Sequence, residues 1–351
     1  MNFKSHRLIR RAAALALCLG MLLALTACGE GTQVQKQLFA MDTTMTLTAY
    51  GKNAEAGLDA AASVINAMDT GLDPENPSST IYAINHAEGA NTAVSGQVAS
   101  MLGTAQLVYQ RSGGALDPSI YPLIKLWGFI DGKYYVPTAE EISAALALRC
   151  FDKLTINSFP SSGGYSVSIP AGGELGLGAV AKGSASAAAV DAMRQAGVKS
   201  GIVSLGGNVQ TLGLKPDGTN WTVAVQDPNY PESFLGVLSV GETAVITSGS
   251  YQRSFEDMRG HSYHHILNPA TGSPTANSLV SVTIICTDGT MADCLSTAMF
   301  VLGENKALEY WRTYGGFEMI MVTSENEVIC TKGLIEKFTL SNDSYTLSFS
   351  E

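Results

Sequence analysis

The sequence predicts an α+β fold in which strand-like and helix-like segments are mixed. Two observations lead to this class. The second half of the chain is dominated by short β-branched runs, and helical segments interrupt these runs without regular strand–helix–strand alternation. We see no internal repeat and no obvious inter-domain linker, and the length permits one large domain or two smaller ones.

The first half of the domain is predicted to begin with a strand and to continue mainly as helix. Apolar residues alternate with threonines in the strand, and helical spacing follows it. Gly113 and Gly114 close the second helix, and Thr138 with Glu141 forms a capping box that opens the third. The predicted elements are a strand at 38–50 and helices at 54–68, 95–111 and 138–148.

The second half is predicted to be mainly strand, with a helix rich in small residues near its start. That helix stops at Gly197, and a later one stops at Gly303. The expected strands are 154–157, 165–169, 202–205, 221–226, 236–240, 244–247 and 279–286, and the expected helices are 180–196, 291–302 and a further one to about 314.

Residues 1–27 have the features of an export signal. The first eleven residues carry four basic side chains and no acidic one, and residues 12–25 form an apolar run too short to span a bilayer comfortably. The segment Leu25-Thr26-Ala27-Cys28 resembles a bacterial lipobox, whose cysteine receives a lipid. An ordinary signal peptide with a chance cysteine is the alternative.

We therefore predict lipidation at Cys28 and a flexible tether over residues 28–37, which are polar and small. The expected location is the extracytoplasmic side of the cell membrane, where the protein would be held by lipid and not by a transmembrane helix.

Charge excludes one class of partner. Without its first 27 residues the chain has 17 basic and 31 acidic residues, a formal charge of −14. Nucleic acid is therefore not expected as a partner, because phosphate binding requires a basic face.

Four cysteines follow the predicted anchor without CxxC spacing: Cys150, Cys286, Cys294 and Cys330. Disulfides remain possible outside the cell, but buried free thiols are the simpler expectation.

Two glycine-rich turns are candidates for ligand binding. Gly113 to Pro118 reads GGALDP. One interpretation is a helix end followed by a turn. The other is a loop that approaches a ligand closely, with Asp117 at the polar edge of that ligand. Leu177 to Gly183 reads LGAVAKG at a strand-to-helix junction. There a helix N-terminus and Lys182 could bind phosphate, although the Walker A spacing is absent.

Two further places carry polar side chains. Ser248-Gly249 precedes His264-His265 in the chain, and only one histidine of the pair can face a given site; it could serve as a general base. Asp293 and Thr297 lie one turn apart on a helix face, so their oxygens could hold Mg²⁺. Alternatively, Thr290 to Asp293 is a capping box, and from spacing alone the cap is preferred.

The order of these motifs resembles the ApbE-type FAD:protein FMN transferases. The resemblance rests on FAMDTTM, GGALDPSI, LWGF, GLGAVAKG, SLGGN, TSG, YHHILNPATG and the Asp293–Thr297 pair, and it runs from about residue 38 to about 303. It implies a single flavin transferase domain of two lobes over residues 38–351. It also implies transfer of FMN from FAD to a Ser or Thr hydroxyl of an acceptor redox protein, with release of AMP and a requirement for Mg²⁺.

The resemblance also assigns roles to residues. His265 would act near the reacting phosphorus as an acid/base group, together with Asp293 at the reaction centre. The residues expected to contact FAD are Met41, Ala115, Leu116, Asp117, Lys182, Ser248 and Gly249. The Mg²⁺ ligands would be the Ala179 carbonyl, the Asp293 carboxylate and the Thr297 hydroxyl.

The sequence departs from the family pattern at three places, one of which is Ser184, where an aromatic residue usually follows the Lys-Gly pair. Gly176 stands where an aspartate that contacts FAD is usual; Glu174, two residues earlier, is a possible replacement. The family's flavin-stacking tyrosine, near residues 73–79, has no clear counterpart, Tyr82 being the nearest. Two other functions remain open: a Mg²⁺-dependent FAD pyrophosphatase that yields FMN and AMP, and a ligand-binding transport lipoprotein, which would require two similar lobes.

Overall fold

The computed structural model describes residues 31–159, 163–230 and 232–351. Its centre is a nine-stranded sheet in which all neighbours pair antiparallel except β15 and β17. In spatial order the strands are β1 (Gln33–Ala40), β2 (Thr43–Tyr50), β6 (Gly201–Leu205), β7 (Asn208–Leu212), β10 (Ala244–Gly249), β13 (Leu279–Cys286), β14 (Glu318–Thr323), β15 (Glu327–Thr331) and β17 (Thr346–Ser350).

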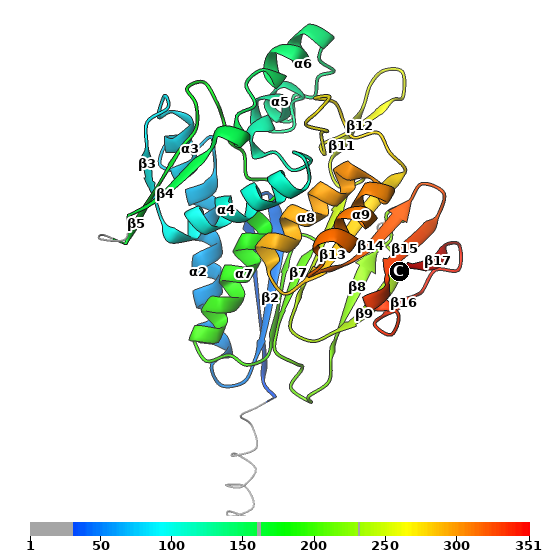
Figure 1. Cartoon of the computed structure of the whole chain (residues 1–351). Helices are drawn as coiled ribbons and strands as arrows, with labels where there is room; N and C mark the ends of the chain where they lie inside the picture. Colours follow the sequence, from blue (N-terminus) through cyan, green and yellow to red (C-terminus); the bar gives the residue numbers. More distant parts are fainter. Residues whose placement is uncertain (1–30, 160–162, 231) are drawn as a thin grey trace, which may run out of the picture.

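Helices cover one face of this sheet (Figure 1). Helix α7 packs between α2 and α8, and α8 also contacts α4 and α9. Their bounds are α2 (Ala54–Leu72), α4 (Gly96–Arg111), α7 (Ala181–Gln195), α8 (Gly289–Leu302) and α9 (Glu304–Tyr314). The N-terminal ends of α7 and α8 thereby lie against each other, which matters for the site.

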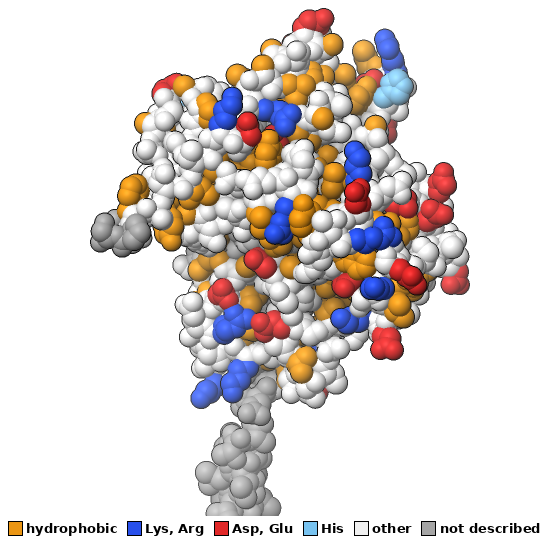
Figure 2. Space-filling view, in the orientation of Figure 1, with side chains coloured by type: hydrophobic (Ala, Val, Ile, Leu, Met, Phe, Trp, Pro, Cys, Tyr) orange, Lys and Arg blue, Asp and Glu red, His pale blue; other side chains and the backbone are white. Residues whose placement is uncertain are grey.

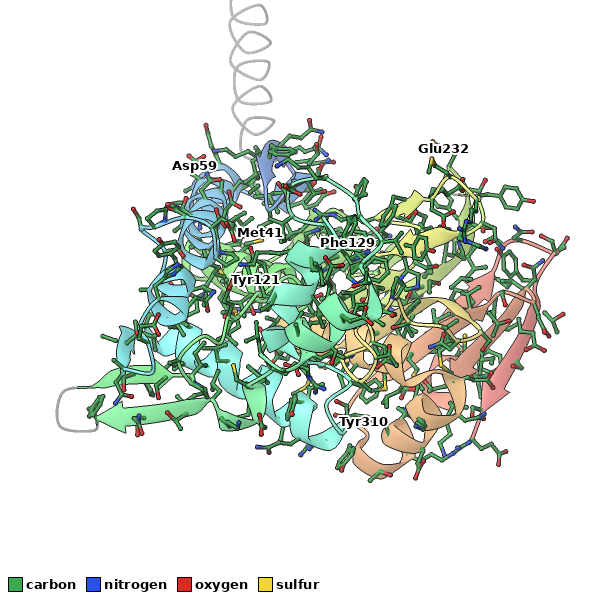
Figure 3. All side chains as sticks on the ribbon, turned by 90° about the horizontal axis from the view of Figure 1, so that it is seen from above. Met41, Asp59, Tyr121, Phe129, Glu232 and Tyr310 are labelled. Atoms are coloured by element: carbon green, nitrogen blue, oxygen red, sulfur yellow. The ribbon has the colours of Figure 1, made fainter. Side chains whose placement is uncertain are left out.

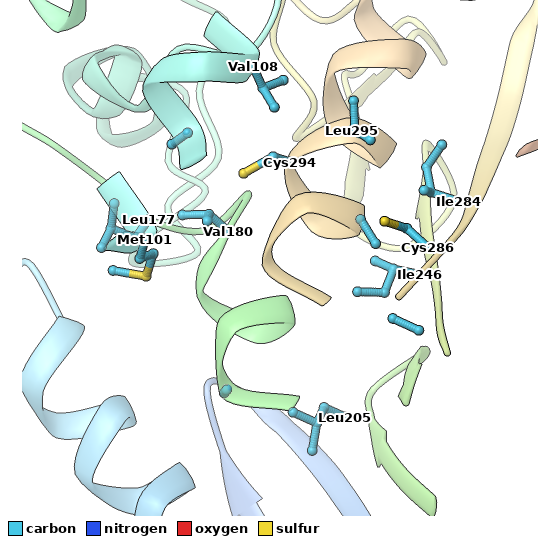
Figure 4. Close-up of a cluster of buried hydrophobic side chains, with 14 of the residues drawn as sticks. Met101, Val108, Leu177, Val180, Leu205, Ile246, Ile284, Cys286, Cys294 and Leu295 are labelled. Carbon is cyan, nitrogen blue, oxygen red and sulfur yellow. The ribbon is translucent and has the colours of Figure 1, made fainter. Parts of the chain in front are cut away.

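Alternating side chains of the central strands fill two separate cores. Ile284 and Ile246 face the helices, where Val180 and Leu295 also pack (Figure 4). Their neighbour Ile285 faces the opposite side of the sheet. A smaller sheet covers that side, made of β8 (Trp221–Gln226), β9 (Phe234–Val240) and β16 (Phe338–Leu340).

The remaining elements build the upper part of the molecule in Figure 1. Leu123, Trp127, Phe129 and Leu267 form a third apolar cluster, which joins α5 to the segment after β12. The elements there are α5 (Tyr121–Leu126), α6 (Ala139–Leu146), the hairpin β11 (Ser254–Glu256) with β12 (Ser262–His264), and at one side α3 (Thr80–Asn85) with the small sheet β3 (Thr92–Val94), β5 (Gly164–Ser168) and β4 (Thr155–Phe159). Short 3₁₀ turns occur at Pro118–Ile120, Phe151–Lys153 and Lys332–Leu334.

The mixed architecture confirms the predicted α+β class, but the first predicted strand is wrong in detail. Residues 38–50 belong to two strands, β1 and β2, joined at Met41 and Asp42. Both turn residues have positive φ, 48° and 58°, as a two-residue type I′ hairpin requires. The sequence lacks the Asn-Gly signal that usually marks such a turn.

The predicted tether is also wrong in its second half. Residues 33–37 form most of β1 and pair in full register with β2, so they are not flexible. Exposure alternates along β1, and the inward positions Val34 and Leu38 pack on the main core. Cys28 and the signal segment lie outside the described residues, so their predicted roles stay predictions.

Cysteine and membrane expectations can be compared with the described residues. All four described cysteines are free and buried, which confirms the expectation of buried thiols. None of the helices within the described ranges is both long and apolar enough to cross a membrane. On the face shown in Figure 2, basic and acidic side chains are interspersed, and no continuous basic field appears.

Candidate active site

A cavity of about 1340 Å³ gathers most of the residues that the sequence singled out. Its wall is built from the β1–β2 hairpin tip, the loop after α2, the N-terminal ends of α7 and α8, and the segment after β12. The predicted residues that line it are Met41, Ala115, Leu116, Asp117, Ala179, Lys182, Ser248, His265, Asp293 and Thr297. Segments more than 250 residues apart in sequence therefore meet in one cavity.

Met41 reaches the cavity through the strained tip of the first hairpin. Its φ of 48° is uncommon for a residue other than glycine. Asp69 on α2 holds the turn, because its Oδ1 accepts the Met41 backbone N–H at 2.8 Å. In Figure 3, Met41, Tyr121 and Phe129 lie in the same central part of the molecule, and all three line the cavity.

Asp293 is a buried carboxylate that binds the start of another helix. Its Oδ2 accepts the Gly183 backbone N–H at 2.7 Å, and its Oδ1 accepts Asn208 Nδ2 at 3.3 Å. Burial raises the pKa of Asp293 to about 6, against the opposing effect of these bonds and of Lys182. The predicted capping role of Asp293 is wrong, because α8 begins at Gly289, two residues before the predicted start at 291. Its N-cap is Asp288, whose Oδ1 accepts the Met291 N–H at 3.2 Å.

Glycine at 183 permits the close approach of α7 and α8. A Cβ on Gly183 would overlap both the Gly289 carbonyl and the Asp293 side chain. Gly183 is the third residue of α7, so its N–H has no acceptor within the helix, and Asp293 satisfies it. The Ala179 carbonyl lies before the N-cap Val180 and accepts no hydrogen bond from the described part of the chain. An oxygen acceptor is thus left open beside the cavity.

Hydroxyl groups of β10 and α8 lie together at the helix that carries Asp293. Ser248 Oγ lies 2.8 Å from Ser296 Oγ and 3.3 Å from Thr297 Oγ1. The resulting donor set is all oxygen: one carboxylate, hydroxyls and an open carbonyl, which are the ligand types that Mg²⁺ prefers. Among the described residues no group of three or more His, Cys, Asp or Glu side chains gathers to hold a metal.

Two cationic side chains face the same cavity. Lys182 lies in the first turn of α7, and its pKa lies below the usual range because burial and then the nearby Arg253 disfavour the charged form. The guanidinium of Arg253 lies 3.5 Å from the Asp42 carboxylate. Arg253 was not singled out from the sequence, because no motif spacing connects it with Lys182.

The two neighbouring histidines face different surroundings, as expected from strand geometry. His264 donates Nε2–H to the Thr275 carbonyl at 3.0 Å and packs edge-on against Phe300. His265 lines the cavity, and its Nδ1 lies 3.2 Å from the Arg253 carbonyl. A carbonyl only accepts, so Nδ1 carries the proton and Nε2 keeps its lone pair. Burial lowers the pKa of His265 to about 4, so the ring is neutral at pH 7.

Asp117 lines the cavity, but its carboxylate is satisfied by the protein itself. Oδ1 accepts the Ser119 N–H at 2.9 Å and the Ser119 hydroxyl at 2.6 Å, and Oδ2 pairs with Arg149 Nε at 2.8 Å. Arg149 also donates to the Pro269 carbonyl at 2.8 Å. Asp117 therefore fixes the loop that carries Ala115 and Leu116, and it ties that loop to the segment after His265.

Among the described residues, Gly249 is the one predicted site residue that does not line the cavity. It ends β10, and its Cα face lies under the Tyr251 ring, which a Cβ would strike. Tyr251 itself lines the cavity. Gly249 therefore packs beneath Tyr251, and its expected contact with FAD stays a prediction.

Comparison with known proteins decides the family. The model of the ApbE family matches residues 41–321, which is most of the chain. The chain belongs to the ApbE family. An FAD:protein FMN transferase of Treponema pallidum is 30% identical over 304 residues, which cover 83% of this chain and 84% of that protein. One of Klebsiella pneumoniae is 33% identical over 274 residues, or 76% of this chain and 82% of that protein.

Solved ApbE structures share the fold. The ApbE protein of Thermotoga maritima superposes with a TM-score of 0.79 at 26% identity, covering 86% of this chain and 98% of that chain. The flavin transferase ApbE of Vibrio cholerae gives 0.72 at 25% identity, covering 90% of this chain and 98% of that chain. The ApbE-like fold implied by the motifs is thereby confirmed, whereas the individual residue roles stay predictions.

Proposed function

We propose that this chain transfers FMN from FAD to a Ser or Thr hydroxyl of an acceptor redox protein and releases AMP. The observation that carries the proposal is the bond between Asp293 and the start of α7, which sets a buried carboxylate beside Lys182 in one cavity. The cavity exceeds the volume of pockets for drug-sized ligands and suits a dinucleotide.

Mg²⁺ is part of the proposal, and the residues present fit it. The Asp293 carboxylate, the Thr297 hydroxyl and the open Ala179 carbonyl would hold the ion. When bound, Mg²⁺ neutralises charge on phosphate oxygens and supports the departure of AMP.

The protein's own groups would supply positioning and proton transfer. The ammonium of Lys182 balances charge on the diphosphate oxygens. His265 Nε2, with its free lone pair, accepts the proton of the acceptor hydroxyl. The hydroxyl oxygen then forms a bond to the FMN phosphorus as the phosphoanhydride bond to AMP breaks, and the negative charge leaves with AMP.

We further propose that Cys28 carries a lipid and holds the enzyme on the extracytoplasmic side of the cell membrane. The lipobox-like LTAC segment supports this location. A Cys28→Ser variant is expected to lose labelling by a fatty-acid analogue and to leave the membrane fraction; labelling that persists would contradict the anchor.

The test of transfer uses the chain from residue 31 onward with FAD, Mg²⁺ and an acceptor protein. The acceptor carries Asp-Gly-x-Ser/Thr-Gly-Ala-Thr, the flavinylation pattern that the family resemblance implies for such acceptors. Intact mass spectrometry of the acceptor is expected to show a gain equal to FMN, together with AMP and loss of both products in EDTA. AMP without a mass gain would indicate the pyrophosphatase instead. FAD binding without either product would contradict both the transferase and the pyrophosphatase function.

A further inference from the structure

The wall of the cavity at Gly176 is closed by an aromatic ring from α5. A Cβ on Gly176 would lie 2.9 Å from Cγ of Tyr121 and closer still to its Cδ2. The Gly176 N–H also donates to the Pro118 carbonyl at 2.9 Å, which fixes the backbone under the ring. No side chain can therefore enter the cavity from position 176, where the family resemblance places a carboxylate.

The same ring holds a carboxylate that reaches the cavity from another element. The Tyr121 hydroxyl donates to Glu75 Oε1 at 2.7 Å, and both residues line the cavity with Gly176. Tyr121 is buried, whereas Glu75 is exposed. Burial, and then the bond to Glu75, raises the pKa of the Tyr121 phenol, so the hydroxyl remains a donor.

The loop that carries Glu75 is fixed before any ligand arrives. Asp73 Oδ1 accepts the Glu75 backbone N–H at 2.9 Å, and the Asp73 carbonyl accepts the Asn76 N–H at 3.2 Å. Asn76 Nδ2 donates back to the Thr70 carbonyl at the end of α2 at 3.2 Å. A preorganised carboxylate loses little conformational freedom when it binds a donor.

Glu174 was suggested by its proximity in the sequence as the replacement for the carboxylate usual at position 176, but it does not reach the cavity. It pairs with Lys125 on α5 and does not line the cavity. Glu75 therefore lines the cavity, whereas Glu174 is engaged with Lys125.

We infer that Glu75, positioned by the Tyr121 hydroxyl, supplies the carboxylate that is missing at Gly176 and binds an N–H donor on a ring edge of FAD. Two ring systems of FAD offer this chemistry: the imide N–H of the isoalloxazine and the amino group of adenine. Tyr121 is a positioning residue, because it acts through Glu75. This inference rests on the proposed function, since it takes FAD as the ligand.

The test measures the Kd of FAD, FMN and ADP for the wild type and for Glu75→Gln, Tyr121→Phe and their double variant. Glu75→Gln is expected to weaken FAD binding roughly tenfold, as loss of a hydrogen bond to a charged group does. Tyr121→Phe should weaken it severalfold, and the double variant should be no weaker than Glu75→Gln alone. Glu174→Gln, the matched control, should leave the Kd of FAD unchanged.

The three ligands identify the ring. A loss seen with FMN and not with ADP assigns Glu75 to the isoalloxazine, and the converse assigns it to adenine; either supports the inference. Additive losses in the double variant, or values within twofold of wild type for Glu75→Gln, overturn it. Wild-type protein that binds FAD without labelling an acceptor would contradict the proposed transfer and leave the Glu75 assignment standing.

Discussion

The Gly183 backbone N–H donates to Asp293 Oδ2 at 2.7 Å, which ties the first turn of α7 to the second turn of α8. Gly183 is the third residue of α7, so its N–H has no acceptor within the helix, and the Asp293 carboxylate satisfies it. The bond fixes the expected carboxylate ligand of Mg²⁺ at the helix start that follows the open Ala179 carbonyl.

Replacing Asp293 is expected to abolish transfer without unfolding the protein. Asp293→Ala removes the only charged group of the expected Mg²⁺ set, so the rate of acceptor labelling should fall by on the order of 10²-fold or more. Asp288→Ala, which removes the N-cap of the same helix, should cost about 1 kcal/mol of stability and retain activity at 25 °C. Equal activity losses in both variants would show that Asp293 acts only through helix stability.

The pH dependence of Mg²⁺ binding should follow Asp293. Its pKa is raised to about 6, so the carboxylate is available above that pH and is protonated below it. Because proton and metal compete for the same oxygens, the apparent Mg²⁺ affinity should fall about tenfold per pH unit below 6. Titration calorimetry at pH 7.5, 6 and 5 measures this, and a constant affinity would contradict it.

His265 should not be the source of that acid limb. Its pKa lies near 4, so the imidazole stays neutral throughout the same pH range. His265→Gln is expected to lower kcat by about 10²-fold, the usual contribution of a general base, while the pH midpoint stays in place. A midpoint that moves in this variant would assign the titration to His265.

Adding one methyl group between α7 and α8 should destabilise the fold. Gly183→Ala places a Cβ against the Gly289 carbonyl and Asp293, an overlap that typically costs about 1–3 kcal/mol. Gly178→Ala is the control, because nothing lies within 4 Å of its added Cβ. Chemical denaturation should show a loss only for Gly183→Ala; similar losses for both would mean that the helices do not meet as described.

Removing the lysine charge should weaken FAD binding and labelling together. Lys182→Met keeps most of the buried stem and removes the ammonium, so the Kd of FAD should rise on the order of tenfold and labelling should slow further. Arg253→Met is a comparison in which the charge is exposed and paired with Asp42, and its effect should be smaller. A larger loss of FAD affinity for Arg253→Met than for Lys182→Met would show that Arg253, and not Lys182, is the main cation for the FAD phosphates.

Residue spacing in the sequence pointed to those parts of the candidate site whose residues are close together in the chain. The Asp293–Thr297 pair and the Lys182 turn depend on helix spacing, which a sequence displays. Contacts such as Tyr121 with Glu75 join positions 46 residues apart, and no pattern in the sequence encodes them. The helix cap failed for another reason: Asp288 and Thr290 can each cap a helix, and only packing against α7 decides between them.

The fold showed the same division. Helix α6 begins after Thr138, the cap that the sequence predicted, and α4 agrees with the predicted helix at 95–111. The hairpin at Met41 was missed because methionine rarely adopts positive φ, and here Asp69 and the β1–β2 pairing hold it there.

The early start of β1 sets how far from the membrane the chemistry would occur. A lipid on Cys28 would leave only five residues to Gln33, a reach of at most about 18 Å. Strand β1 then runs about 26 Å to the hairpin tip that carries Met41 into the cavity. The cavity would therefore stay within roughly 45 Å of the bilayer, and acceptors would have to present their hydroxyl within that distance. The anchored enzyme would then meet its acceptors by diffusion along the membrane surface.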